Sequence, residues 1–104
     1  MKRILYFSRA GIRINAINPT IVRTRIFREN PEDFHDSELG QFFAQSHPLH
    51  GRASKPEEQA EVILFLSSPA ANFITGECVR CDGAITLKGF PPNYFVPGSK
   101  PSEA

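Results

Sequence analysis

The spacing of apolar and polar residues predicts a short strand near the start of the chain. Residues 12–17 hold isoleucine at positions 12, 14 and 17, and β-branched residues favour strands. Pro19 is expected to end this strand, because proline cannot donate a hydrogen bond to a ladder. Ligands bind beyond the carboxyl ends of strands in open α/β sheets, so residues 20–24 are a candidate ligand loop.

A helix is predicted from about residue 56 to residue 66. Ser54 and Glu57 have the spacing of a capping box, and Pro56 costs no hydrogen bond in a first helical turn. The second half of this helix is apolar nearly all round, which indicates burial on more than one side, in a larger domain or against another subunit. A second strand is predicted over residues 77–80, before the turn signal Asp82-Gly83.

The other segments carry weaker patterns. Residues 25–50 are mixed, with short helices expected near 25–28 and 37–45, the second capped by Asp36 or Ser37. Residues 88–104 are rich in proline and glycine and predict a tail without a helix. The expected organisation is an irregular lead over residues 1–10, a folded segment over residues 11–87 and a tail over residues 88–104.

Length, charge and hydropathy narrow the class of protein. The 104 residues suffice for one small domain with a modest core. The formal net charge of +1 gives no reason to expect nucleic acid or an anionic membrane as a partner. No apolar run approaches the roughly 20 residues needed to span a bilayer. With two cysteines and no recognisable export signal, we expect a location in the cytoplasm or the interior of an organelle.

Two groups of potential metal ligands are better explained without a metal. Cys78 and Cys81 form a C-x-x-C pair, but no second pair completes a zinc site, and residues three apart on a strand point to opposite faces. Both are expected to be buried as small hydrophobic residues, an expectation that rests on the family resemblance described below. His35, His47 and His50 match no metal-ligand spacing and are expected at the surface. The sequence therefore predicts no metal site.

Several motifs occur together in the order and spacing typical of one family. The motifs are GIRINAINP at residues 11–19 with Thr24, HPL at 47–49 with Gly51-Arg52, PEEQA at 56–60, FLSS at 65–68, ITGE at 74–77 and Asp82-Gly83. In this combination the chain resembles the carboxyl-terminal part of the short-chain dehydrogenases/reductases, from the family's sixth strand to its seventh. The resemblance implies an α/β fold, the incomplete carboxyl-terminal portion of a Rossmann-type, doubly wound parallel sheet.

The resemblance also implies NAD(P)-dependent oxidation of an alcohol or reduction of a carbonyl, with NAD or NADP as the cofactor. In the family, the loop after the sixth strand holds the nicotinamide carboxamide. By position, the backbone of Val22 and the hydroxyl of Thr24 would make that contact, and Asn18 and Pro19 would shape the approach. A peptide and a hydroxyl supply the donor and the acceptor that a carboxamide needs. Thr20 stands where the family usually has glycine, and threonine would be strained if this position required positive φ.

Two features on which the family's chemistry depends are not found in this sequence. No two of the seven glycines lie close enough to form the glycine-rich turn that holds the dinucleotide. The family pairs a tyrosine with a lysine four residues later, which lowers the pKa of the tyrosine. Here the residue four positions after Tyr6 is Ala10, and the residue four positions after Tyr94 is Gly98.

We therefore assign no catalytic residue, and whether the chain acts as an enzyme stays open. The first interpretation is a truncated or fragmentary family member that is inactive alone and binds NAD(P) weakly or not at all. The alternative is a non-catalytic interaction module that forms homo-oligomers or associates with full-length family members. The alternative arises because the family's last helix and last strand often form subunit contacts.

Overall fold

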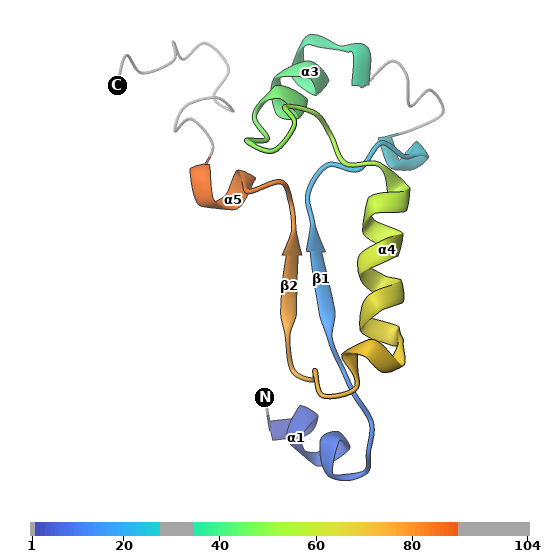
Figure 1. Cartoon of the computed structure of the whole chain (residues 1–104). Coiled ribbons are helices and arrows are strands. Elements are labelled where there is room, and N and C mark those ends of the chain that lie inside the picture. The colour runs from blue at the N-terminus through green and yellow to red at the C-terminus, as the bar shows by residue number, and fades with distance from the viewer. Residues whose placement is uncertain (1, 28–34, 90–104) are drawn as a thin grey trace.

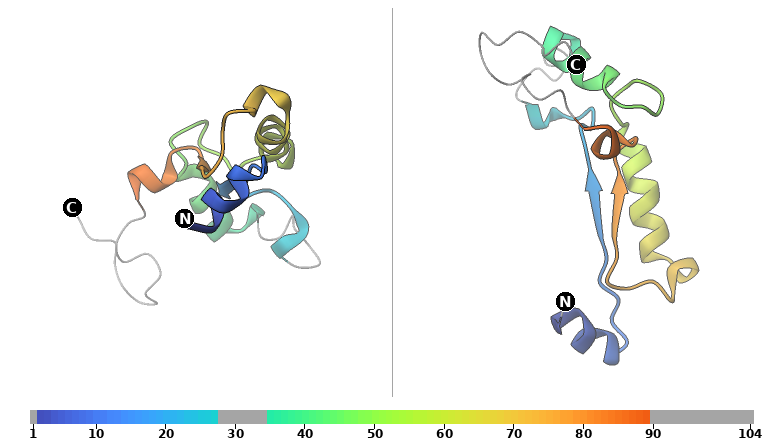
Figure 2. Two further views of the ribbon diagram at one scale, coloured as in Figure 1. Left: turned by 90° about the horizontal axis from the view of Figure 1, so that it is seen from below. Right: turned by 90° about the vertical axis from the view of Figure 1, so that its left-hand side faces the viewer.

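A computed structural model describes residues 2–27 and 35–89 of the chain. The elements in chain order are α1 (Lys2–Arg9), β1 (Ala16–Pro19), the 3₁₀ turn η1 (Arg25–Phe27), α3 (Glu38–Gln45), α4 (Pro56–Ser67), the 3₁₀ turn η2 (Pro69–Ala71), β2 (Cys78–Cys81) and α5 (Ile85–Lys88). Figure 1 and the right-hand view of Figure 2 show α4 running alongside the two strands. In both views α1 lies beyond the amino ends of the strands, and α3 and α5 lie at their carboxyl ends. In the described part of the chain, no helix has the length and apolarity needed to cross a membrane.

The two strands pair in parallel, which confirms the predicted α/β arrangement of adjacent strands joined through a helix. Ala16 pairs with Cys78 and Pro19 with Cys81 at the two ends of the ladder. β1 ends at Pro19 as expected but begins at residue 16 rather than residue 12. The late start has a local cause, since the Asn15 carboxamide, rather than its backbone, receives the Glu77 amide at 3.1 Å.

The first residues of the chain were expected to be irregular, and that expectation is wrong because they form α1. Gly11 ends the helix with φ at +78°, a conformation that glycine adopts without strain. The Ile12 amide donates to the Phe7 carbonyl, and the Gly11 amide donates to the Ser8 carbonyl, both at 3.0 Å. These two bonds form a Schellman motif, which satisfies carbonyls that the helix end would leave unpaired.

The two short helices expected between residues 25 and 50 are confirmed as η1 and α3, although residues 28–34 lie outside the described part of the chain. Ser37 rather than Asp36 caps α3, because its hydroxyl accepts a hydrogen bond from the Gly40 amide at 3.0 Å. The helix α5 was not expected so close to the predicted tail. Most of that tail, residues 90–104, is likewise outside the described residues.

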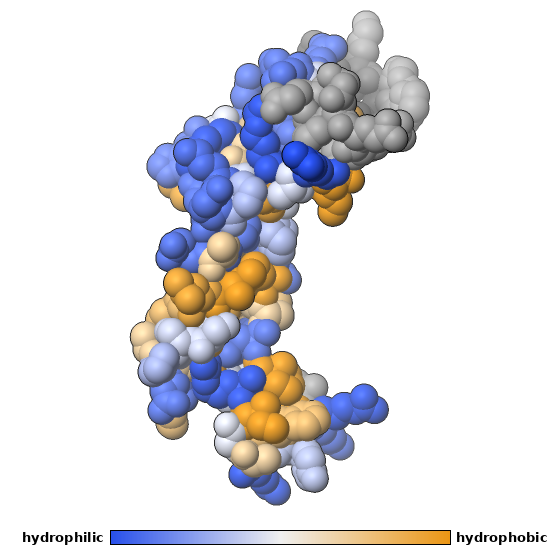
Figure 3. Space-filling model, turned by 90° about the vertical axis from the view of Figure 1, so that its right-hand side faces the viewer, coloured by the Kyte–Doolittle hydropathy of each residue, from blue (hydrophilic) through white to orange (hydrophobic). Residues whose placement is uncertain are grey.

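The core is small, and much apolar surface stays exposed. In the described residues, the buried hydrophobic side chains are Leu66, Ala71 and Ile85. The described residues do not bury α4 on more than one side, since Leu64 keeps 64% and Phe65 46% of its surface exposed. The burial expected from its sequence, in a larger domain or against another subunit, stays a prediction. Figure 3 shows the molecule from the side on which α4 lies, with apolar side chains gathered across the middle of this face and again at the end where α1 lies.

Candidate functional site at the carboxyl ends of the strands

The residues predicted to bind a cofactor lie where β1 leaves the sheet. Asn18 and Pro19 are the last two residues of β1, and Val22 and Thr24 follow in the connection to η1. A pocket of about 480 Å³ opens here between this connection and the first turns of α4. Its lining residues are Pro19, Thr20, Ile21, Val22, Thr24, Ile26, Pro56, Gln59, Ala60 and Ile63. Asn18 does not line the pocket, so the structure brings three of the four predicted residues together.

The Val22 peptide is oriented so that it can bind a ligand. An isolated parallel bridge joins Val22 to Ser54. The bonds of this bridge use the neighbours of Val22: the Arg23 amide donates to the Ser54 carbonyl at 2.9 Å, and the Ser54 amide donates to the Ile21 carbonyl at 3.0 Å. Successive peptides in extended backbone alternate in direction, so the N–H and C=O of Val22 point away from Ser54. Within the described residues, no backbone partner takes either group.

Thr24 is half-buried at the same pocket. Its hydroxyl oxygen accepts a hydrogen bond from the Ile26 amide at 3.3 Å, which leaves the hydroxyl proton free to be donated. The strain foreseen at Thr20 does not occur, because the non-glycine residues with positive φ in the described chain are His50 and Ala84. Threonine is therefore compatible with this loop.

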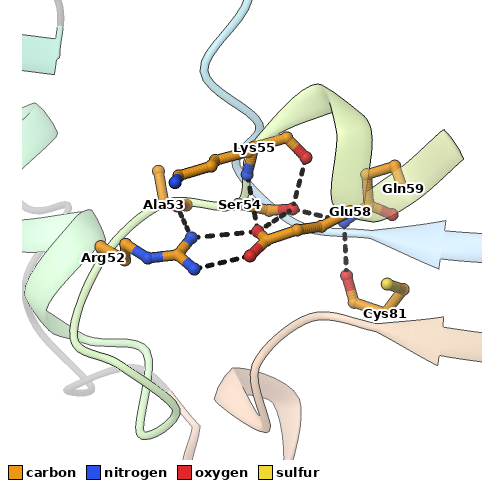
Figure 4. A network of polar contacts seen from close by, with 7 residues as sticks. All are labelled: Arg52, Ala53, Ser54, Lys55, Glu58, Gln59 and Cys81. Carbon is orange, nitrogen blue, oxygen red and sulfur yellow. Dashed lines mark hydrogen bonds and ion pairs between the residues drawn. The ribbon is translucent and has the colours of Figure 1, made fainter. Parts of the chain in front are cut away.

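An ion pair fixes the amino end of α4 beside the pocket. The Arg52 guanidinium donates to both carboxylate oxygens of Glu58, at 3.0 and 2.6 Å, as Figure 4 shows. The same carboxylate accepts the Lys55 amide at 2.8 Å. The predicted capping box of Ser54 and Glu57 is wrong by one residue, because the helix begins at Pro56 after Lys55, and Glu58 holds the third helical position.

The contacts of Glu58 strongly favour its charged form. The hydrogen bonds from Arg52, and after them the bond from the Lys55 amide, lower the pKa of Glu58 from 4.5 to about 2. A carboxylate whose pKa is depressed by folding stabilises the fold above its unfolded pKa, and this contribution is lost as the pH falls to the folded pKa. The contribution of Glu58 is therefore present above about pH 4.5 and lost between about pH 4.5 and pH 2.

We expect thermal unfolding of α4 to occur at lower temperature at about pH 3 than at about pH 6, because part of the Glu58 population is then neutral. Far-ultraviolet circular dichroism measures the transition. Glu58→Gln is expected to lower the transition at about pH 6 and to reduce the difference between the two pH values. Glu57→Gln is the matched control, since it removes one charge from the same turn and leaves the Arg52 contact intact. Equal pH dependence in both variants would contradict this role of Glu58.

Asp82 organises the exit from β2. Its carboxylate accepts hydrogen bonds from the Thr86 hydroxyl and from the Ala84 amide. These bonds, that of Thr86 foremost, lower the pKa of Asp82 in spite of its burial. They also hold Ala84 at a φ of +68°, which turns the chain from β2 into α5.

Two of the three histidines and one cysteine differ in their exposure from what the sequence predicted. His35 and His47 are buried rather than at the surface, whereas His50 is exposed as expected. Cys78 is exposed and Cys81 half-buried, so the predicted burial of Cys78 is wrong. Exposed and half-buried residues alternate along β2, and Cys78 lies on its exposed face. The described residues contain no group of three potential ligands that could hold a metal ion.

The chain is similar to many oxidoreductases over most of its own length. A family described as enoyl-(acyl carrier protein) reductase matches residues 5–86. The chain is 39% identical over 80 residues to a 2,5-dichloro-2,5-cyclohexadiene-1,4-diol dehydrogenase of Sphingobium indicum, covering 77% of this chain and 31% of the relative. It is 38% identical over 84 residues to a cyclohexanol dehydrogenase of an Acinetobacter species, covering 81% of this chain and 30% of the relative.

Solved structures give the same picture. A short-chain type dehydrogenase/reductase from Mycobacterium ulcerans superposes with a TM-score of 0.69 at 30% identity, covering 83% of this chain and 30% of that one. A 4-hydroxyisoleucine dehydrogenase mutant complexed with NADH and succinate superposes with a TM-score of 0.70 at 28% identity, covering 83% and 34%. The chain spans about a third of the length of the proteins that it matches.

Proposed function

This chain belongs to the short-chain dehydrogenase/reductase family, and from that premise we propose that residues 18–24 form the nicotinamide end of an NAD(P) site in an alcohol or carbonyl oxidoreductase. The backbone N–H and C=O of Val22, which both point away from Ser54, carry the proposal. They can bind the two ends of a carboxamide, and the Thr24 hydroxyl can donate to the carboxamide oxygen. Fixing the nicotinamide in this way would leave one face of the ring open for hydride transfer, a chemistry that the cofactor itself supplies.

The chain alone is expected to have no oxidoreductase activity. Its sequence holds neither a glycine-rich turn for the pyrophosphate nor a tyrosine followed by lysine four residues later. Tyr6 lies on α1, at the amino ends of the strands, whereas the candidate site lies at their carboxyl ends. The residues that remain would contact only one end of the cofactor, so calorimetric titration of the chain with NADH should give binding weaker than micromolar.

The role of Thr24 can be tested in a chimera that restores the rest of the site. Residues 5–86 would replace the matching stretch of the 4-hydroxyisoleucine dehydrogenase, a protein that has been complexed with NADH. Thr24→Val keeps the shape of the side chain and removes the hydroxyl, and we expect roughly five- to tenfold weaker NADH binding, the effect of one hydrogen bond. The change in NADH fluorescence on binding gives the dissociation constants.

Thr24→Ser is the matched control, because it retains the hydroxyl and should bind NADH within about twofold of the parent chimera. Equal binding by the valine and serine variants would show that the hydroxyl makes no contact with the cofactor. Micromolar NADH binding by the isolated chain would instead contradict its expected dependence on a restored pyrophosphate site.

The second candidate function is a non-catalytic module that binds full-length family members or further copies of itself. The exposed apolar surface favours it, since Ile63 and Leu64 on α4 keep 50% and 64% of their surface exposed, and Phe73 is fully exposed. A chain acting in this way would co-purify with an intact family member.

A further inference from the structure

The loop over residues 20–24 is anchored at two places. Where it leaves the sheet, Pro19 pairs with Cys81, the last residue of β2. Further along, the backbone of Ser54 binds the loop through the residues on either side of Val22, at 3.0 and 2.9 Å. These two bonds direct the N–H and C=O of Val22 away from Ser54, because successive peptides in extended backbone alternate in direction.

The Gln59 side chain bonds to both anchors. Its Nε2 donates to the Ser54 hydroxyl at 2.8 Å and to the Cys81 carbonyl at 2.9 Å. Figure 4 shows Gln59 reaching from α4 to the end of β2 and to Ser54. The Cys81 carbonyl can only accept a hydrogen bond, which fixes the orientation of the carboxamide, and the two bonds use both protons of Nε2. One side chain therefore joins the two segments that hold the loop.

Gln59 has no group left with which to bind a ligand itself. The residue keeps 7% of its surface exposed, and its Oε1 is buried without a hydrogen-bond partner among the described residues. An unpaired buried acceptor costs free energy, and an apolar side chain at this position would avoid that cost. What Gln59 provides, and an apolar residue could not, is the pair of bonds that joins Ser54 to Cys81.

Ser54 is also held from its other side. Its hydroxyl lies 3.1 Å from the Lys55 carbonyl oxygen and 3.3 Å from Oε2 of Glu58. A hydroxyl has one proton and two lone pairs, so it can donate to one of these oxygens while it accepts the bond from Gln59. The ion pair with Arg52 keeps the Glu58 carboxylate in place. These contacts fix Ser54 on α4, and the contact with Gln59 links it to β2.

We propose that Gln59 is a positioning residue for the nicotinamide site, acting through Ser54 and Cys81 on the loop over residues 20–24. The inference rests on the function proposed for residues 18–24. When the conformation that binds a ligand is only partly populated, the apparent affinity falls in proportion to that population. By joining the two anchors, Gln59 keeps the N–H and C=O of Val22 directed outward before the cofactor arrives, so that binding does not have to order the loop.

Hydrogen–deuterium exchange on the full chain tests whether Gln59 holds the loop. Gln59→Met keeps the length of the side chain and removes both donors. We expect amide exchange over residues 21–24 and 53–55 to become roughly three- to tenfold faster, the effect of about one hydrogen bond. Exchange over residues 61–66 of α4 should change less than about twofold. Gln45→Met makes the same change at an exposed glutamine of α3 and should alter none of these rates.

Two results of this experiment would overturn the inference. Unchanged exchange over residues 21–24 in Gln59→Met would show that the loop does not depend on this side chain. Equal acceleration over residues 21–24, 53–55 and 61–66 would assign Gln59 a general structural role instead of a role in the loop. The experiment uses the unaltered chain as its reference and does not depend on the chimera.

The effect on cofactor binding is measured in the chimera that restores the rest of the site. There Gln59→Met is expected to weaken NADH binding roughly three- to tenfold. Ser54→Ala removes the hydroxyl that Gln59 binds, and in that background Gln59→Met should weaken binding by about twofold or less, since residues that act together have non-additive effects. Fully additive effects would mean that Gln59 does not act through Ser54, and would overturn the inference.

The variants at Thr24 separate this inference from the proposed function. Weaker NADH binding in Thr24→Val with unchanged binding in Gln59→Met would overturn the positioning role and leave the proposed function standing. Unchanged binding in both variants would contradict the proposed function as well. Weaker binding in Gln59→Met alone would support the positioning role and remove only the contact assigned to the Thr24 hydroxyl.

Discussion

The purified chain is expected to sediment as oligomers and to unfold over a broad temperature range. A two-stranded sheet is marginally stable by itself, and parallel strands are normally covered on both faces. Here the described core holds few hydrophobic side chains, while Phe73 is fully exposed and Leu64 keeps 64% of its surface exposed. The outer edge of β1 also has no partner strand among the described elements, and such an edge favours association.

Leu64→Lys tests which surface drives this association. It removes an exposed apolar side chain from α4, and we expect the weight-average mass in analytical ultracentrifugation to fall at least about twofold, toward the monomer. Ser67→Lys is the matched control, since it adds the same charge to the same helix without removing apolar surface, and it should leave the mass unchanged. A monodisperse monomer with one sharp unfolding transition in the unaltered chain would contradict the expectation.

The parts of the fold that the sequence predicted correctly are those with strong local signals. Pro56 marks the start of α4, Ile17 and Pro19 fall within β1, and the Asp82-Gly83 turn marks the end of β2. α1 escaped prediction, although Gly11 provides the signal of a helix end when Phe7 and Ile12 are considered with it.

The start of β1 and the cap of α4 depend on which side chains bind the backbone, and sequence patterns do not determine this. The Asn15 carboxamide takes the Glu77 amide before the ladder begins. Glu58 rather than Glu57 takes the Lys55 amide, because it can also reach Arg52. Both outcomes depend on tertiary contacts, which override local spacing.

The sequence predicted the part of the candidate site that is formed by neighbouring residues, and it missed the part that depends on tertiary contacts. Pro19, Val22 and Thr24 meet at one pocket because they follow one another along the chain. His47 and Gln59 both line a second pocket, at the exit of β2, only because β2 returns beside the connection over residues 47–54 and α4. A buried histidine and a buried glutamine have no sequence pattern that separates them from exposed ones, and so neither was predicted.

Arg13 binds three backbone carbonyls, two at the end of α4 and one in the connection that leads to β2. Its Nη1 donates to the Leu66 carbonyl at 2.7 Å and to the Ile74 carbonyl at 3.3 Å, and its Nη2 donates to the Ser68 carbonyl at 3.3 Å. The last carbonyls of a helix have no partner within the helix, and a cation at that end is also favoured by the helix dipole. Arg13, three residues before the start of β1, thereby holds the end of α4 and the approach to β2.

Arg13→Met is expected to speed amide exchange over residues 67–77 by roughly 10- to 100-fold, because the aliphatic stem stays while the charged donors are lost and three carbonyls lose a partner. Hydrogen–deuterium exchange with mass spectrometry on the full chain measures the change. Arg13→Lys should give an exchange rate between those of the unaltered chain and Arg13→Met, since one ammonium cannot reproduce the forked geometry of guanidinium. Arg3→Met, which removes an exposed cation from α1, should leave exchange over residues 67–77 unchanged. Equal exchange in the Arg13 and Arg3 variants would contradict this role and would mean that local bonds, such as those of Ser68 to Phe65, suffice to hold the end of α4.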